Sequence, residues 1–223
     1  MTLSKDNLFS QTERKLRCWR YTSLNTLGAR REDCLTLTAK FFLSYLRAPS
    51  LVGAITPSST FLARALCQHA RGAQHLIELG AGTGAVTQYL REEFPEATLV
   101  VVERDDVMAA ALQRRFGTYT VVADAIQARN DLFNGIPDQS VAVSSLPFRS
   151  FPKTIAAQVV TMLRDFLLAS PNRRLVQYTY GQRVPFDSPH RALIWRRQEL
   201  ILRNVPPAWV WTLQQSLDLQ PIS

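Results

Sequence analysis

The feature that most constrains the fold is the regular alternation, after residue 75, of short β-branched or aliphatic runs with segments of helical length. The runs predict five strands, at residues 75–79, 98–103, 118–123, 140–146 and 174–180. The segments between them predict helices at residues 87–93, 106–116, 128–133 and 153–169. Strands and helices in this order are typical of an α/β fold with a doubly wound, mostly parallel sheet.

The two ends of the chain add elements to this pattern. Residues 199–204 and 209–213, joined through Val205-Pro206-Pro207, predict a closing antiparallel strand pair. The cluster of Trp195, Arg191, Arg196 and Arg197 just before them is interpreted as an exposed helix face. Residues 1–52 form an N-terminal helical extension in this interpretation, and residues 53–223 form the main domain, with a helix beginning near Pro57 and ending before Gly72.

Positive charge is concentrated in the N-terminal extension. The chain has 223 residues and a net charge of +8, and residues 1–50 hold nine Lys or Arg against four acids. Leu8, Leu16 and Trp19 recur at helical spacing beside basic side chains, as in a helix that lies in a membrane headgroup layer. A basic extension on a near-neutral body indicates a polyanionic partner, either an anionic membrane surface or a nucleic acid.

The fragment LIELGAGTG, residues 76–84, places an acid and three glycines after an expected buried strand. The acid is Glu78, and the glycines are Gly80, Gly82 and Gly84. Glycine permits turn angles that a side chain forbids, and it lets the backbone pass close beneath a ligand. The spacing differs from that of nicotinamide dinucleotide enzymes, and no Gly-Lys-Ser/Thr follows as in a P-loop.

Two later strand ends supply what an adenosine-like ligand needs. Glu103 ends the second strand, beside the glycine turn in a doubly wound sheet, where a carboxylate can accept both hydroxyls of a ribose. Asp124 and Ala125 follow the third strand, where an acid and a backbone N–H can pair with an adenine. This set resembles the class I S-adenosylmethionine-dependent methyltransferases, which have a Rossmann-like fold. The resemblance implies that S-adenosyl-L-methionine is the cofactor and that Glu78 borders its methionine part.

The fourth strand end, residues 144–148, has the sequence Ser-Ser-Leu-Pro-Phe. Methyltransferases that act on an adenine amine typically have Asn or Asp before a Leu-Pro-aromatic sequence here. This chain has Ser144 instead, and we count it among the cofactor-binding residues. The substitution weakens the interpretation as a ribosomal-RNA adenine N6-dimethyltransferase, which the basic charge and Phe148 favour.

Four segments give a closer resemblance: GAITPSSTFLARAL (53–66), SSLPFRSFP (144–152), LVQYTYG (175–181) and RNVPPAWVW (203–211). Together they resemble the soluble, Sinorhizobium-type bacterial phospholipid N-methyltransferases, over roughly residues 53–211. The family typically has Ser-Gly-Leu-Pro at the fourth strand, so Ser145 is a departure. The resemblance implies stepwise methylation of phosphatidylethanolamine to phosphatidylcholine by a peripheral protein on the inner face of the cytoplasmic membrane.

This activity needs groups around a lipid amine and its phosphate. A product that becomes a quaternary cation is bound by aromatic faces, and we expect Tyr180 and Tyr45 around the amine, with Phe148, Tyr178 and Tyr21 as further candidates. Arg183, just beyond Tyr180, is the candidate for the phosphate. The three histidines have no metal-binding spacing, so we assign no metal.

Two other interpretations stay open beside the lipid methyltransferase. One is the RNA adenine dimethyltransferase, for which the chain offers no separate C-terminal RNA-binding domain. The other is a cofactor-binding protein that has lost catalysis and acts as a membrane-associated scaffold. We expect a monomer, nucleic acid as the less favoured partner, and cysteines that serve as small apolar fillers.

Overall fold

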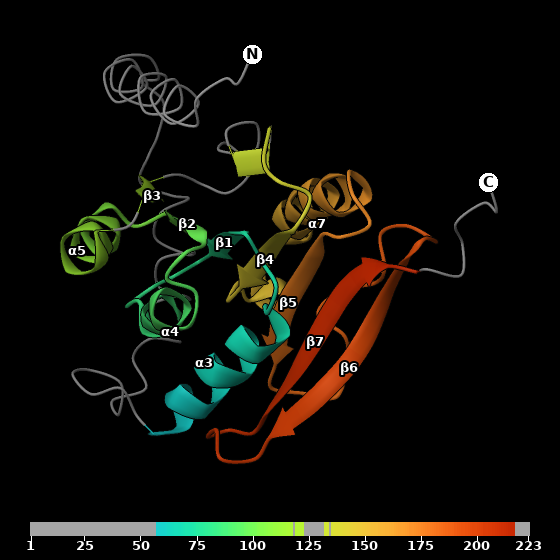
Figure 1. Ribbon diagram of the computed structural model, residues 1–223. Helices are drawn as coiled ribbons and strands as arrows, with labels where there is room; N and C mark the ends of the chain where they lie inside the picture. Colours follow the sequence, from blue (N-terminus) through green and yellow to red (C-terminus); the bar gives the residue numbers. More distant parts are fainter. Residues whose placement is uncertain (1–56, 118, 123–131, 134, 217–223) are drawn as a thin grey trace, which may run out of the picture. The chain divides into compact units, whose positions relative to one another are not determined.

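A computed structural model of the chain describes residues 57–117, 119–122, 132–133 and 135–216 (Figure 1). The predicted N-terminal extension, with Tyr21 and Tyr45, lies outside these residues, as do the domain boundary at residue 52, Asp124 and Ala125, and most of the helix expected at 128–133. The described helices are α3 (Pro57–His69), α4 (Ala85–Glu93), α5 (Asp106–Phe116) and α7 (Lys153–Leu168), with a short 3₁₀ helix at Phe148–Ser150.

Among the described residues, seven strands form one sheet in the order β3-β2-β1-β4-β5-β7-β6. In chain order they are β1 (His75–Leu79), β2 (Thr98–Glu103), β3 (Tyr119–Val122), β4 (Ser140–Ser144), β5 (Arg174–Thr179), β6 (Leu193–Ile201) and β7 (Ala208–Gln215). The first five are parallel, whereas β7 runs antiparallel to both β5 and β6. The doubly wound, mostly parallel sheet with an antiparallel C-terminal pair is therefore confirmed.

Each face of the sheet is covered by helices (Figure 1). Leu76 of β1 points toward the layer formed by α3, α4 and α5, while its neighbour Ile77 points toward α7, because successive side chains of a strand face opposite ways. Helix α7 buries residues at helical spacing, namely Val159, Met162, Leu163, Phe166 and Leu167. Each such side chain contributes about 1.5–3 kcal/mol to the hydrophobic stabilisation of the fold.

The cluster around Trp195 was wrongly interpreted as a helix face. Trp195, Arg196 and Arg197 lie on β6, which begins at Leu193, well before the expected start at residue 199. A register shift between Arg197 and Glu199 interrupts the alternation that marks a strand. The indole of Trp195 is partly buried and packs on Phe186 with ring centroids 5.0 Å apart, against the core on the α7 side of the sheet. The exposed Arg196 and Arg197 lie on an edge strand.

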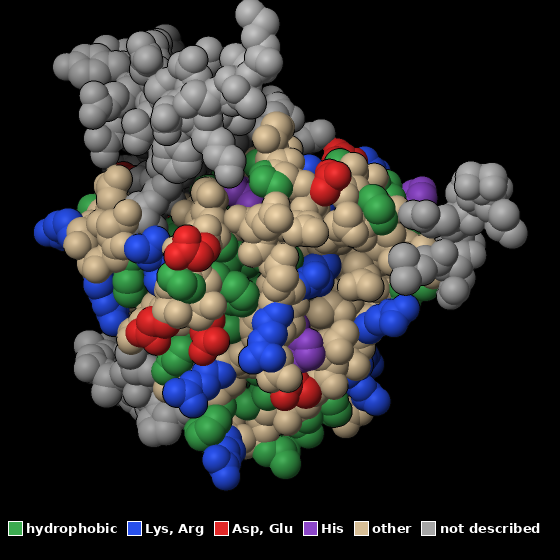
Figure 2. Space-filling view, in the orientation of Figure 1, with side chains coloured by type: hydrophobic (Ala, Val, Ile, Leu, Met, Phe, Trp, Pro, Cys, Tyr) green, Lys and Arg blue, Asp and Glu red, His purple; other side chains and the backbone are tan. Residues whose placement is uncertain are grey.

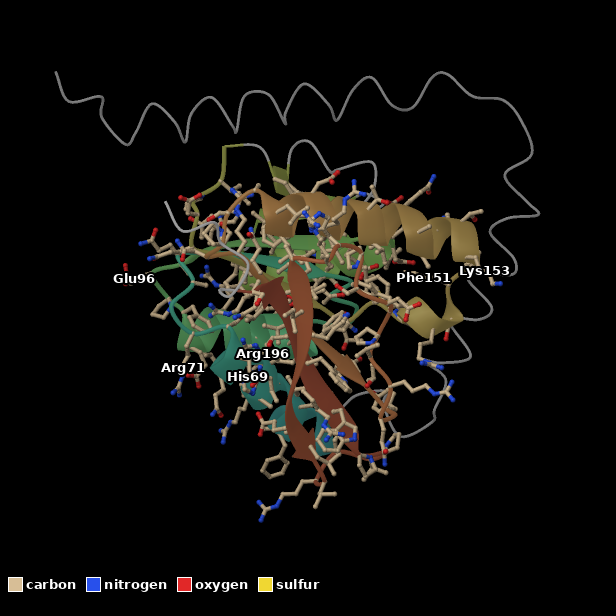
Figure 3. All side chains as sticks on the ribbon, turned by 90° about the vertical axis from the view of Figure 1, so that its right-hand side faces the viewer. His69, Arg71, Glu96, Phe151, Lys153 and Arg196 are labelled. Carbon is tan, nitrogen blue, oxygen red and sulfur yellow. The ribbon has the colours of Figure 1, made fainter. Side chains whose placement is uncertain are left out.

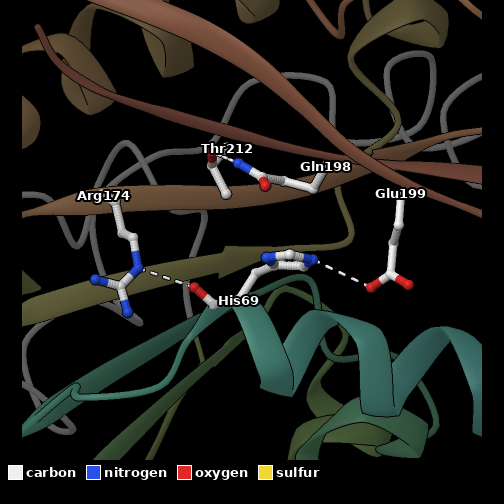
Figure 4. A network of polar contacts seen from close by, with 5 residues as sticks. All are labelled: His69, Arg174, Gln198, Glu199 and Thr212. Atoms are coloured by element: carbon white, nitrogen blue, oxygen red, sulfur yellow. Dashed lines mark hydrogen bonds and ion pairs between the residues drawn. The ribbon is translucent and has the colours of Figure 1, made fainter.

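The C-terminal end of α3 is fixed to the sheet by polar contacts (Figure 4). The Arg174 guanidinium donates to the His69 carbonyl at 2.8 Å, and the His69 ring contacts the Glu199 carboxylate at 3.1 Å. Figure 3 shows His69 and Arg71 on one side of the sheet, and Phe151 and Lys153 at the start of α7 on the other. Because Arg174 begins β5, the end of α3 lies at the amino edge of the sheet, and its first turn lies toward the carboxyl edge.

Cys67 of α3 is buried in this layer, where it serves as an apolar filler as expected. Burial raises the pKa of its thiol to about 12, with a smaller contribution from nearby glutamates, so the thiol is neutral. No helix within the described ranges is long and apolar enough to cross a membrane.

The three glycines of the β1–α4 turn are expected to differ in what they contribute to stability. A Cβ at Gly84 would lie 2.6 Å from atoms of both Leu112 and Phe116, whereas one at Gly82 would meet no described atom within 4 Å. We expect Gly84→Ala to lower the free energy of unfolding by about 3 kcal/mol through overpacking and strain. Gly82→Ala should cost only about 1 kcal/mol, from its positive φ alone. Urea unfolding of both variants measures the difference, and equal losses would contradict this assignment.

Candidate functional site

The turn between β1 and α4 combines tight packing with one open backbone position. Gly80, Gly82 and Gly84 have φ angles of +77°, +56° and +82°, a region that L side chains rarely adopt. A Cβ at Gly80 would lie 2.8 Å from the end of the Leu146 side chain, and one at Gly84 would lie 2.6 Å from two side chains of α5, so a side chain at either position would have to displace its neighbours. Of the three, only Gly82 would place a Cβ clear of every described residue, and there a ligand can approach the backbone.

Glu103 holds this turn in place from the end of β2. One carboxylate oxygen accepts the Gly82 N–H at 2.8 Å, and the other accepts the Asp105 N–H at 2.9 Å. The predicted proximity of Glu103 to the glycine turn is thus found in the structure. An ionised carboxylate has about four acceptor positions, so each oxygen keeps one for a further donor such as a hydroxyl.

Glu78 is a buried acid beneath the same turn. It is fully inaccessible to solvent, and one of its oxygens accepts the Thr87 hydroxyl at 2.6 Å. The other oxygen, Oε1, has no hydrogen-bond partner among the described residues. Burial raises the pKa of Glu78 to about 7, against the opposing effect of the Thr87 hydrogen bonds and with a smaller contribution from Glu103. A buried acceptor without a partner is costly, and a cationic or N–H group of a ligand would satisfy it.

At the fourth strand end, Ser144 organises the loop that follows. Its hydroxyl is buried and accepts the Leu146 N–H at 3.2 Å, and Leu146 in turn packs over Gly80. Gln177 of β5 donates to the Leu146 carbonyl at 3.2 Å, while its own side-chain oxygen has no partner within the part of the chain that the structure describes. Ser144 therefore contacts the loop directly. Gln177, which the sequence pattern does not single out, contacts the same loop from β5.

The aromatic candidates fall into two groups. The rings of Tyr178 and Tyr180 lie 5.5 Å apart in an edge-to-face arrangement, and Tyr180 is 41% exposed just beyond the end of β5. Arg183 is exposed in the loop that follows. Phe148, by contrast, was wrongly counted as available, because it is buried and packs on Phe186 with ring centroids 4.7 Å apart. The Leu-Pro turn before it directs the ring into the core.

Together these groups form a site at the carboxyl edge of the sheet, around the reversal of strand order between β1 and β4, where α/β sheets commonly bind ligands. An open glycine backbone, a carboxylate with spare acceptor positions and an unsatisfied buried acid fit a ligand with hydroxyls and a cationic or N–H group. Tyr45, Asp124 and Ala125, also predicted here, lie outside the described residues. Among the described residues, no group of three or more His, Cys, Asp or Glu could hold a metal ion.

Known proteins share this architecture. A 1,6-didemethyltoxoflavin-N1-methyltransferase from Burkholderia thailandensis, solved with S-adenosylhomocysteine, aligns with a TM-score of 0.57 at 16% identity, covering 86% of this chain and 92% of that one. A TehB-like S-adenosylmethionine-dependent methyltransferase from Corynebacterium glutamicum aligns at 0.54 and 12% identity, covering 80% and 98%. The chain therefore has the Rossmann-like fold of class I methyltransferases, as predicted.

Sequence comparison adds a relative with a stated substrate. The ornithine lipid N-methyltransferase of Singulisphaera acidiphila is 28% identical over 147 residues, which cover 62% of this chain and 74% of the relative. No protein-family model matches the sequence.

The raised pKa of Glu78 predicts a pH-dependent stability. A group whose pKa rises from 4.5 to about 7 on folding contributes fully below pH 4.5, and its contribution is lost as the pH rises through 7. Relative to Glu78→Gln, which does not titrate, the wild type should lose roughly 3 kcal/mol of its free energy of unfolding between pH 4.5 and 8. Urea unfolding across this range measures the loss, and parallel pH profiles for the two proteins would refute it.

Proposed function

We propose that the protein is an S-adenosylmethionine-dependent methyltransferase that methylates the amine of a membrane lipid. The observation that carries the proposal is the arrangement at the β1–α4 turn, where Glu103 holds the open backbone of Gly82 above the unsatisfied Glu78. The fold and the lipid N-methyltransferase relative support the reaction class and the substrate class.

The cofactor binds across the glycine turn in this proposal. The two free acceptor positions of Glu103 take the ribose hydroxyls, and the bare backbone at Gly82 lets the ligand approach. The methionine ammonium provides the donor that Glu78 lacks. We further propose that Asp124 and Ala125 bind the adenine, and that Ser144 shapes the pocket through the Leu146 loop.

The bound cofactor supplies an electrophilic methyl group on a sulfonium. The chain must then hold a neutral lipid amine in line with that methyl group and accommodate a product that carries more methyl groups. Tyr180 presents a partly exposed ring supported by Tyr178, and aromatic faces bind methylated ammonium groups. We propose Tyr180, together with Tyr45, for the amine.

The substrate we propose is phosphatidylethanolamine, with phosphatidylcholine as the fully methylated product. The relative's name makes ornithine lipid the alternative within the same class. Both lipids carry an amine near an anionic group, a phosphate in one and a carboxylate in the other. Arg183, which is exposed beyond Tyr180, is our candidate for that anion in either case.

The test is the transfer of labelled methyl groups from S-adenosylmethionine to three substrates offered separately: phosphatidylethanolamine, ornithine lipid and unmodified ribosomal RNA. We expect label in phosphatidylethanolamine. Label in ornithine lipid alone would keep the lipid reaction and overturn the headgroup assignment. Label in RNA would favour the adenine methyltransferase, and cofactor binding with no transfer would favour the scaffold.

The ribose assignment predicts a selective loss of cofactor affinity. Glu103→Ala should weaken S-adenosylhomocysteine binding by about 10- to 100-fold, because it removes both hydroxyl acceptors and loosens the Gly82 turn. Glu96→Ala, which changes an exposed acid just before β2, is the matched control and should bind as the wild type does. Calorimetric titration gives both affinities, and an unchanged affinity for Glu103→Ala would remove the assignment.

We also propose that the basic N-terminal residues attach the protein, as a monomer, to the anionic inner face of the cytoplasmic membrane. Deletion of residues 1–20, which hold five Lys or Arg, should reduce binding to anionic vesicles by about tenfold or more. Cofactor affinity should stay the same, because residues 1–20 include none of the residues that we propose for cofactor binding. Vesicle sedimentation and calorimetry separate the two effects, and undiminished sedimentation would contradict the proposal.

A further inference from the structure

The turn between β6 and β7 lies at the same edge of the sheet as the glycine turn. Ile201 pairs with Ala208 to close the hairpin, and Trp209 pairs with Thr179 at the carboxyl end of β5. The connecting residues 202–207 therefore project beyond the carboxyl ends of the parallel strands. In Figure 1 this turn and the start of α3 both lie at the bottom of the view.

This turn exposes apolar side chains from an ordered backbone. Leu202 is 71% exposed and Val205 is 82% exposed, and Leu200 adds partial exposure beside them. Asn204 points inward, where its amide donates to the Pro206 carbonyl at 2.7 Å and its N–H donates to the Ile201 carbonyl at 3.2 Å. The turn is thus held with Asn204 inside and with Leu202, Arg203 and Val205 outside. Contiguous exposed apolar patches are found at protein–protein, membrane and ligand-binding sites, and the residues around this turn indicate which of these applies.

Arginines frame the exposed apolar residues. The Arg203 guanidinium lies 5.1 Å from the ring centroid of Phe61, and Arg64 of α3 lies 5.9 Å from that of Tyr89. Both arginines line a shallow cleft of about 360 Å³ between α3 and β6, together with Phe61, Leu200 and Leu202. Glu199, the acid of this cleft, is in contact with His69. Figure 2 shows hydrophobic and basic side chains gathered at the bottom of the molecule.

We propose that this hairpin tip, formed by Leu200, Leu202, Arg203 and Val205 with Phe61 and Arg64 of α3, inserts into the headgroup layer of an anionic phospholipid bilayer. Leu202 and Val205 enter the acyl boundary, and the arginines bind lipid phosphates. An anionic bilayer has charged phosphates at its surface and apolar acyl chains beneath them. Apolar side chains flanked by cations are complementary to such a surface. The inference rests on the proposed function in one respect: docking at this edge would bring the carboxyl edge of the sheet to a lipid substrate.

The test uses the full chain and vesicles of phosphatidylcholine with and without phosphatidylglycerol, in the absence of cofactor. Leu202→Ser/Val205→Ser should weaken binding to the anionic vesicles by about tenfold or more. Ile194→Ser, which changes a 40% exposed residue at the far end of β6, is the matched control and should bind as the wild type does. Similar urea midpoints would establish that the variants are folded.

The salt dependence of vesicle binding distinguishes a contribution of the hairpin tip from one of the basic N-terminal residues. Raised salt weakens electrostatic attraction and leaves apolar insertion intact, so the deficit of Leu202→Ser/Val205→Ser should persist at high salt. The deficit of Arg203→Gln, about fivefold at low salt, should shrink there. Arg114→Gln, at the opposite edge of the sheet, controls for the lost charge and should have no effect.

Methyl transfer distinguishes this inference from the proposed function. With detergent-dispersed lipid as substrate, the tip variants should match the wild-type rate, because the tip residues take no part in cofactor binding or in the amine site. If Leu202→Ser/Val205→Ser binds anionic vesicles at high salt as strongly as the wild type does, the inference is overturned. Absence of vesicle binding by the wild type would also overturn it. Normal vesicle binding without transfer to any lipid would instead refute the proposed function alone.

Discussion

The site depends on the contact between the Glu103 carboxylate and the Gly82 N–H. This one interaction joins the end of β2 to the turn that follows β1. It fixes the one glycine of this turn at which a Cβ would meet no described atom within 4 Å. The same carboxylate holds the Asp105 N–H at the start of α5. This single carboxylate therefore helps to position two helices, α4 and α5, relative to two strands, β1 and β2. The open backbone at Gly82 is therefore held in a fixed conformation by the hydrogen bonds of Glu103.

Two acids, Glu78 and Glu103, lie at this turn in different surroundings. Glu103 contributes to the raised pKa of Glu78, yet the surroundings of the two acids differ. Glu103 accepts two backbone N–H groups, whereas Glu78 is buried and its Oε1 has no hydrogen-bond partner among the described residues. An incoming cationic or N–H group would therefore find at Glu78 an acceptor that no described residue satisfies. The protein keeps an uncompensated polar atom there, a cost that makes sense for a group that acts on a ligand.

Much of this arrangement could be predicted from the sequence because parallel strands bring their carboxyl ends to one edge, so residues that end successive strands must meet. Glu103 and the glycine turn were placed together on this basis alone. Thr87 and Gln177 were missed because a polar residue in a helix or strand pattern is usually solvent-facing, and its burial depends on tertiary packing. Strand β6 was placed too late in the sequence because the irregularity between Arg197 and Glu199 breaks its alternation. Phe148 was misjudged because a sequence does not indicate the direction in which a side chain leaves a Pro-containing turn.

The position of β7 has a consequence for how the protein is made. This strand is the last of the described sheet in chain order, yet it lies inside the sheet, between β5 and β6. Until residues 208–215 have left the ribosome, β5 presents an unpaired edge, and β6 has no partner among the described strands. The nascent chain therefore remains open to mispairing until β7 has been synthesised and has paired with β5. Shielding of the β5 edge during translation, until β7 pairs with it, would prevent such mispairing.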